Sequence, residues 1–410
     1  MASLLYQTKV LLKRYPKLYV PARKIRDYLA SSADEDTRTK VIELRAEQPC
    51  RGDALLSFIN EPFFLTREQA GFYGQHTHYW AALEMAEAFL AHGYNVDVIR
   101  WNNDEFLPQK DYAFFIDCRL NLARVGPLLK KECLKIMYIE TAHWLFHMTA
   151  QYRRLLALQQ RKGVTIPPHK TVDVNWGIEH ADCAVTIGNA FTMSTYGYAQ
   201  KPMYRVPVIS PTVYPWPDQK DFQACHKHFL WLGSQGLVHK GLDLVLDALA
   251  ALPEYHLTVC GPIDKEPEFA RAYYKELYHT PNIHTLGWVD ASSPAFGEIA
   301  SQCLGVIYPS CSEGGGGSVI TCMHAGLIPI VSYEASVDVD DFGVILPESS
   351  VEAIKDTIQS VAGCSTDHLQ GMARRAWEVA RAKYTRERFA EEFRKVLDIF
   401  DPTYPSQYST

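Results

Sequence analysis

Four glycines in succession form the feature of this sequence with the clearest chemical meaning. They follow Glu313 and lie between an apolar, strand-like run and a helix-like stretch, in PSCSEGGGGSVITCMHAGLIPIVS (309–332). Glycine lets a ligand come within hydrogen-bond distance of the main chain, and the free N–H groups at a helix N-terminus bind anions. We therefore predict that the phosphate or sugar of a ligand meets this backbone; a flexible turn is the alternative. The residues predicted to line this contact are Gly314, Gly315, Gly316, Gly317 and Ser318.

A second phosphate-directed element precedes it in the segment FLWLGSQGLVHKGLDLVLDAL (229–249). A strand-like run leads into a glycine-bearing loop with Ser234 and Gly236, and Lys240 stands just before a helix-like run. The loop is not a P-loop, because the pattern GxxxxGK[ST] is absent. A lone lysine before a helix is often merely solvated. Two glycine-bearing turns between a strand and a helix nevertheless predict that Lys240 and nearby backbone donors face one ligand.

A histidine-rich segment, KIMYIETAHWLFHMTA (135–150), places His143 just after an expected strand. A histidine there could hydrogen-bond a sugar or accept a proton, or it could be satisfied within the structure. Glu140, His143 and His147 could also place three metal ligands on one helix face. The segment lacks the HExxH order, and no second Glu/His cluster has matching spacing. We therefore predict no metal site.

Such groups need a scaffold, and beyond residue 50 short apolar runs alternate with longer amphipathic ones. The runs expected to be strands are 54–59, 95–100, 112–116, 134–139, 184–187, 229–232, 256–260, 283–286, 304–308 and 328–332. Helices are expected at 242–251, 266–278 and 318–324. This alternation is typical of parallel sheets covered by helices.

The length of the chain favours two domains, because 410 residues exceed the size at which a single core stops growing. The proline-bearing segment 206–228 separates two series of strands. We therefore predict an α/β fold of two Rossmann-like, doubly wound domains, at residues 1–214 and 215–385. A ligand cleft is expected between the carboxyl ends of their strands.

Composition limits the class of partner. A net charge of −6 argues against nucleic acid, no apolar run is long enough to span a bilayer, and the ten scattered cysteines fit a reducing cytoplasm. Residues 1–26 hold seven basic residues and no acidic one. They are either a solvated helix or a peripheral contact with an anionic membrane, which would place the protein at the inner face of that membrane.

These motifs together resemble those of the retaining nucleotide-sugar glycosyltransferases of the two-domain B architecture, family 4 in particular. The resemblance is carried by 229–249, by HLTVCGP (256–262), by NIHTLGWVD (282–290) and by 309–332. The first half is similar more loosely, through HADCAVTIG (180–188) and VPVISP (206–211). In all, it covers about residues 54–390.

The resemblance implies roles for residues of the second half. Glu313 would contact the donor sugar as a catalytic residue, and Lys240 would bind the diphosphate. Thr321 stands where the family has a second glutamate, which holds the nucleotide ribose. The loop 233–239 lacks the arginine that commonly pairs with the lysine. We expect the Thr321 hydroxyl and loop N–H groups at Ser234 and Gly236 to replace these groups.

For the first domain the resemblance implies an acceptor site. His143 would face the reaction centre, and the loop before the first helix would contact the acceptor through Gly74, Gln75, His76 and Thr77. The neighbouring His76 and His78 carry no weight by themselves. A terminal helix within 386–410 would return to the first domain.

The predicted reaction is a metal-independent transfer of a sugar, with retention, from a nucleoside diphosphate to a hydroxyl group. No cofactor is expected; the donor would be linked to UDP or GDP, and the acceptor would be a glycan, a lipid-linked glycan or a small molecule. Two alternatives stay open, the first because of Thr321 and the missing arginine. One is a catalytically impaired nucleotide-sugar-binding partner subunit, and the other is an epimerase on the same fold.

Overall fold

A computed structural model describes residues 37–47, 50–65 and 77–401 of the chain. The first half forms a seven-stranded sheet in the order β1-β3-β2-β4-β5-β6-β7, parallel except for the antiparallel pair β1·β3. Its strands are β1 (Ile42–Leu44), β2 (Gly52–Phe58), β3 (Tyr94–Arg100), β4 (Phe114–Asp117), β5 (Leu134–Ile139), β6 (Cys183–Thr186) and β7 (Met203–Arg205). The apolar runs form these strands because both faces of the parallel sheet are covered.

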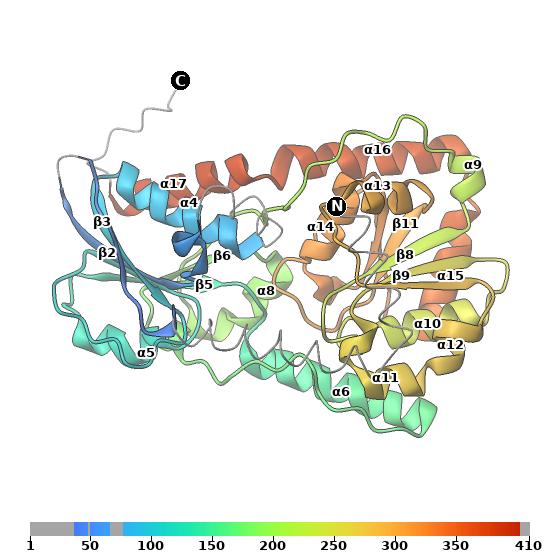
Figure 1. Cartoon of the computed structure of the whole chain (residues 1–410), viewed down its shortest axis with the longest axis horizontal. Coiled ribbons are helices and arrows are strands. Elements are labelled where there is room, and N and C mark those ends of the chain that lie inside the picture. The colour runs from blue at the N-terminus through green and yellow to red at the C-terminus, as the bar shows by residue number, and fades with distance from the viewer. Residues whose placement is uncertain (1–36, 48–49, 66–76, 402–410) are drawn as a thin grey trace.

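The second half forms a six-stranded, fully parallel sheet in the order β10-β9-β8-β11-β12-β13. Its strands are β8 (His228–Leu232), β9 (His256–Cys260), β10 (Ile283–Gly287), β11 (Gly305–Tyr308), β12 (Ile328–Val331) and β13 (Val344–Ile345). The predicted fold of two Rossmann-like domains is confirmed, and so are the ten predicted strands (Figure 1). The prediction missed β1, β7 and β13, whose two or three residues are too short to show a hydrophobic pattern.

Most helices pack on the faces of these sheets. The predicted α10 (Leu242–Ala250) and α14 (Gly317–His324) are confirmed. The single helix predicted at 266–278 is wrong, because η4 (Ile263–Lys265), α11 (Pro267–Ala272) and α12 (Tyr274–His279) replace it; the break falls at Tyr273, whose buried ring stacks on Phe269. Further helices are η1 (Glu61–Phe64), α4 (Thr77–Ala91), α5 (Asn121–Val125), η2 (Gly126–Leu128), α7 (Gly177–His180), α8 (Ala190–Thr195), η3 (Gly197–Ala199), α9 (Phe222–Cys225), α13 (Pro294–Ser301), η5 (Tyr333–Ala335) and α15 (Val351–Ala362).

Helix α6 (Trp144–Lys162) leaves the first sheet after β5 and reaches the second domain, along the lower edge of Figure 1. Leu158 lies in the hydrophobic core of the second domain. Arg161 Nη2 lies 2.6 Å from Asp243 Oδ2 of α10, and Lys162 Nζ lies 2.7 Å from Glu276 Oε1 of α12. The segment between β5 and β6 is thus held by the opposite domain.

The C-terminal helices make the reverse crossing. Helix α16 (Thr366–Lys383) packs on α14 of the second domain, and α17 (Arg386–Phe400), whose N-cap is Thr385, packs on α4 of the first (Figure 1). Phe389 and Phe393 join the first domain's core, and Tyr94 Oη donates to Asp401 Oδ2 at 2.9 Å. Because α6 and α17 cross in opposite directions, each domain is tied to a segment that belongs to the other half of the chain.

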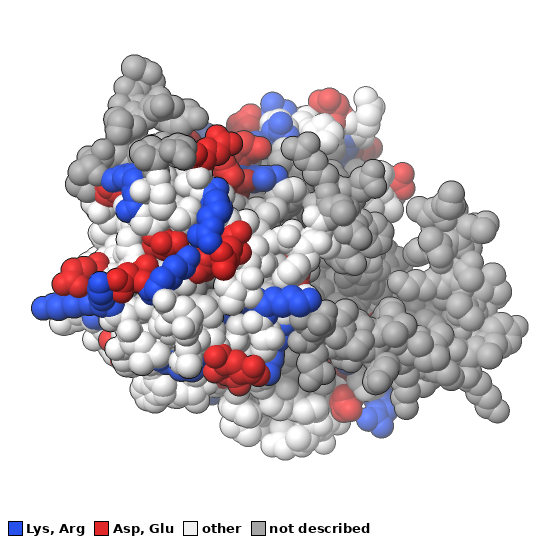
Figure 2. Space-filling model, turned by 60° about the vertical axis from the view of Figure 1, so that its left-hand side comes forward, with Lys and Arg blue, Asp and Glu red and all other residues white. Residues whose placement is uncertain are grey.

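On the face shown in Figure 2, the described residues carry acidic and basic side chains close to one another. The predicted membrane contact at residues 1–26 lies outside the described residues. Among the helices that the structure describes, none combines the length and apolarity needed to cross a membrane.

Candidate active site

A cavity of about 530 Å³ lies between the two domains, at the carboxyl ends of their strands. The second domain contributes residues that follow β8, β9 and β11, and the first contributes the start of α4 and the end of β5. The predicted site residues on its wall are Thr77, Ser234, Lys240, Glu313, Gly314, Gly315, Gly316, Gly317, Ser318 and Thr321. Gly74, Gln75 and His76 lie outside the described residues. The fold therefore gathers into one space residues that are up to 244 positions apart in sequence, from Thr77 to Thr321.

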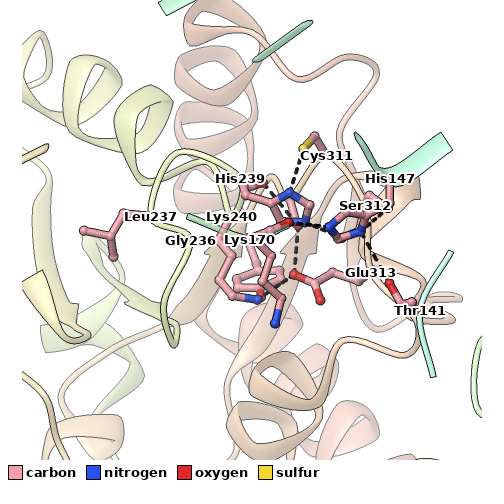
Figure 3. Close-up of polar contacts among 12 residues, drawn as sticks. Thr141, His147, Lys170, Gly236, Leu237, His239, Lys240, Cys311, Ser312 and Glu313 are labelled. Carbon is pink, nitrogen blue, oxygen red and sulfur yellow. Dashed lines mark hydrogen bonds and ion pairs between the residues drawn. The ribbon is translucent and has the colours of Figure 1, made fainter. Parts of the chain in front are cut away.

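A buried ion pair forms the floor of this cavity. Lys240 Nζ lies 2.7 Å from Glu313 Oε1, and the two side chains are only 5% and 15% exposed (Figure 3). Tyr308 Oη accepts from Lys240 at 2.7 Å and donates to Glu313 Oε1 at 2.9 Å, and Ser310 Oγ donates to the same oxygen. Burial alone would raise the pKa of Glu313, but the ammonium of Lys240 lowers that pKa well below its usual range. Glu313 is therefore an anion at neutral pH.

The glycine run is explained first by the approach of other parts of the chain. A Cβ atom at Gly314 would lie 2.1 Å from the carbonyl oxygen of Glu140, and one at Gly315 would lie 2.5 Å from Val208 Cγ2. At Gly316 it would meet Val337 Cγ2 at 2.2 Å, and φ is +55°. Gly317 alone of the four has room for a side chain, its nearest neighbour being 4.0 Å away. Close protein atoms thus leave no space for a side chain at three of the four glycines.

The N-terminus of α14 opens onto the same cavity. Its N-cap is Gly316, which provides no side-chain cap, and Gly317, Ser318 and Thr321 line the wall. The N–H groups of a first helical turn have no partner within the helix, and the helix dipole makes this end positive. Thr321 Oγ1 donates to Gly317 O at 3.0 Å, so only its lone pairs are available to a ligand. This end of α14 is suited to an anion.

The first domain contributes a second charged group, which the sequence did not predict. Glu140 Oε1 lies 2.6 Å from Arg119 Nη2, and Glu140 Oε2 lies 3.3 Å from His78 Nδ1. Burial raises the pKa of Glu140, but His78 and Arg119 reverse this shift and lower it. A usable signal existed: Arg119 and Glu140 each follow the end of a strand, and these strands, β4 and β5, are neighbours.

One part of the chain matches a known protein family. Residues 226–363 match the model of the family described as "Glycosyl transferases group 1". The matched residues lie within the second domain. No curated protein matches the sequence of this chain.

The following two solved structures share the fold of this chain. Sucrose-phosphate synthase from Thermosynechococcus elongatus is 14% identical over 86% of this chain and 100% of that chain, with a TM-score of 0.58. Alr3699/HepE from Anabaena, in complex with UDP and glucose, is 12% identical over 85% and 100%, with a TM-score of 0.53. TarM from S. aureus is 12% identical over 70% of this chain and 55% of that chain, with a TM-score of 0.48. This chain therefore spans about half the length of TarM.

His143 lies apart from the cavity, in contrast to its predicted place at the reaction centre. Its Nδ1 accepts from the N–H of Leu145 at 3.4 Å and caps α6, and its Nε2 donates to Tyr198 Oη at 3.0 Å. Burial lowers the pKa of His143. The hydrogen bonds of the imidazole are thus satisfied within the first domain.

The alternative metal site does not form either. Glu140 faces the cavity, His143 caps α6, and His147 Nε2 donates to the carbonyl oxygen of Lys170 at 2.7 Å. In the ranges 37–47, 50–65 and 77–401, no three His, Cys, Asp or Glu residues lie close enough to hold a metal ion.

Gly236 also departs from its predicted role, because its backbone donor is occupied. The N–H groups of Gly236 and Leu237 donate to Glu266 Oε1 at 2.5 and 3.2 Å, and Gly236 is not part of the cavity wall. Lys170 lines the cavity instead, from the segment that follows α6. The sequence gives no sign of this, because Lys170 follows β5 by some thirty residues in a segment without regular structure.

Proposed function

We propose that this glycosyltransferase moves a sugar, with retention, from a UDP-sugar to a hydroxyl group of an acceptor. The observation that carries the proposal is the buried Lys240–Glu313 pair beside the N-terminus of α14, in a cavity walled by both domains. The presence of UDP and glucose in the similarly folded HepE supports uridine as the base.

Charge in the cavity suits the departure of a diphosphate. As the bond to the sugar breaks, negative charge grows on the leaving phosphate, and fixed donors lower the energy of that state. Lys240 and the N–H groups at Gly317 and Ser318 supply such donors. The ammonium of Lys240 and the partial positive charge of these N–H groups would offset the charge without a bound metal.

Glu313 is an anion that cannot donate a proton at neutral pH, because its pKa is lowered. Its carboxylate would therefore accept hydrogen bonds from the sugar hydroxyls and orient the ring. The acceptor hydroxyl would enter from the side of His78 and Glu140, which lie opposite the second domain's wall. The acceptor oxygen would attack from the face that the diphosphate leaves, which retains the configuration, and its proton would pass to an oxygen of the leaving phosphate.

The experiment is a thermal-shift panel of UDP, GDP, ADP and the corresponding diphosphate sugars, followed by an assay of nucleotide release with glycan and lipid-linked acceptors. We expect stabilisation by UDP and UDP-sugars, and acceptor-dependent release of UDP. Stabilisation by GDP alone would mean that the donor carries guanosine instead of uridine. The absence of any nucleotide effect on the folded protein would overturn the proposal.

A second candidate is a nucleotide-sugar-binding subunit without turnover. Thr321 favours it, because its hydroxyl proton is committed to Gly317 and no carboxylate is available there for the ribose. UDP would then stabilise the protein, yet no acceptor would release it from a UDP-sugar.

A further inference from the structure

The ammonium of Lys170 has no direct partner among the described residues, although the carboxylates of Glu313 and Glu140 partly oppose the effect of Lys240 on its pKa. Lys170 lines the cavity, and no hydrogen bond or ion pair to its ammonium is found within residues 37–47, 50–65 and 77–401. Its side chain runs beside that of Lys240 near Glu313 (Figure 3). The pKa of Lys170 is lowered, mainly by the nearby ammonium of Lys240 and secondly by burial. An ammonium held near another ammonium favours an anionic partner.

The position of Lys170 is fixed by its backbone. Its carbonyl oxygen accepts from His147 Nε2 at 2.7 Å, and its N–H donates to Gln151 Oε1 at 3.0 Å. Both partners belong to α6, and this helix is anchored to the second domain where Arg154 Nη2 donates to Pro309 O at 3.0 Å. Lys170 is thereby delivered to the second domain's wall by a segment of the first half of the chain.

The loop 233–239 makes room for this lysine. A Cβ atom at Gly236 would lie 2.9 Å from Lys170 Cβ, and Gly236 has a φ of +95°. The same loop has no arginine and has committed two of its N–H groups to Glu266. The aliphatic stem of Lys170 therefore occupies the space over a loop that provides no cation of its own.

We infer that Lys170 is a second phosphate-binding residue, which acts with Lys240 on the diphosphate of the donor. This inference rests on the proposed function, since it names a further contact in the same site. A diphosphate between the two ammonium groups would relieve their repulsion and give each a charge-assisted hydrogen bond. The donor site would then be complete only when α6 is docked on the second domain.

The test compares the variants Lys170→Met, Lys170→Arg and Lys240→Met with the wild type. Calorimetry measures the binding of UDP, uridine and inorganic pyrophosphate to each protein. A lost charge-assisted hydrogen bond corresponds to roughly a tenfold or larger loss of affinity. We expect that loss for UDP and pyrophosphate in Lys170→Met, no change for uridine, and substantial recovery in Lys170→Arg. Lys275→Met, at an exposed lysine of α12 outside the cavity, is the matched control and should bind UDP like the wild type.

Thermal unfolding separates a binding role from a structural one. Without nucleotide, Lys170→Met should unfold at the same temperature as the wild type or higher, because a repulsion has been removed; with UDP, its stabilisation should be smaller. A lower unfolding temperature without nucleotide, with unchanged UDP affinity, would overturn the inference. If UDP binds Lys170→Met as tightly as the wild type but does not bind Lys240→Met, the inference about Lys170 is overturned and the proposed function stands. If the wild type binds no nucleotide, the proposed function fails and takes this inference with it.

Discussion

The two walls of the cavity are built by different means. On the wall of the second domain, Lys240 and Glu313 each stand at a turn between a strand and a helix, and they are buried and paired with each other. On the wall of the first domain, His78, Arg119 and Glu140 come from three separate elements, and Arg119 meets Glu140 because β4 and β5 are neighbours. The residues of the second-domain wall can therefore be recognised from local sequence, whereas those of the first-domain wall come together only in the tertiary structure.

The largest effect is expected on the wall of the second domain. Glu313→Gln keeps the size of the side chain but removes the anion that orients the sugar, so turnover should fall by about 10²–10³-fold. UDP release with acceptor measures this. Glu140→Gln is the matched substitution on the opposite wall, and an equal loss there would contradict the division of roles between the two walls.

Stability should show the same asymmetry. Lys240→Met leaves the buried Glu313 carboxylate without its partner, which costs about 3–5 kcal/mol in the free energy of unfolding. Adding Glu313→Gln should recover most of this loss without restoring turnover. Chemical denaturation of the two variants measures both, and a double variant no more stable than Lys240→Met would contradict the pairing.

The pH dependence of this pair follows from the pKa shifts. The pKa of Glu313 is lowered in the folded protein, so its contribution is present above its ordinary value of 4.5 and is lost as the pH falls below it. The pKa of Lys240 is raised, because the carboxylate of Glu313 outweighs burial, so its contribution disappears only as the pH rises above 10.5. The stability difference between wild type and double variant should therefore stay flat between about pH 5 and 10.

The glycine run allows the contact between the walls to be tested within four residues. Gly314→Ala places a methyl group against the backbone of Glu140 and should cost about 1–3 kcal/mol in the free energy of unfolding. Gly317→Ala has room and should leave stability nearly unchanged, while weakening UDP binding where the ligand approaches. Equal destabilisation by both would show that the four glycines serve one backbone conformation rather than two functions.

The contrast between the two walls also explains which parts of the fold and the site could be predicted from the sequence. The strands were predictable because buried parallel strands are continuous apolar runs, and Lys240 and Glu313 because their turns are local. The docking of α6 on the second domain, and with it Lys170, depends on side-chain contacts such as Arg161 with Asp243, more than eighty residues apart. His143 was misplaced for a related reason: sequence locates it after a strand, but only packing shows that its ring turns toward Tyr198.

The smallest effect on turnover is expected at His143, which the sequence had placed at the reaction centre. His143→Asn keeps a side chain suited to capping α6, and the residue lies outside the cavity, so turnover should change by less than about threefold. His78→Asn removes the imidazole beside Glu140 and should raise the acceptor KM about tenfold with unchanged UDP binding. Steady-state kinetics of the two variants, with one acceptor varied at saturating donor, measure this. A large loss of turnover in His143→Asn, with UDP binding intact, would mean that the first-domain wall rearranges during catalysis and brings His143 to the substrate.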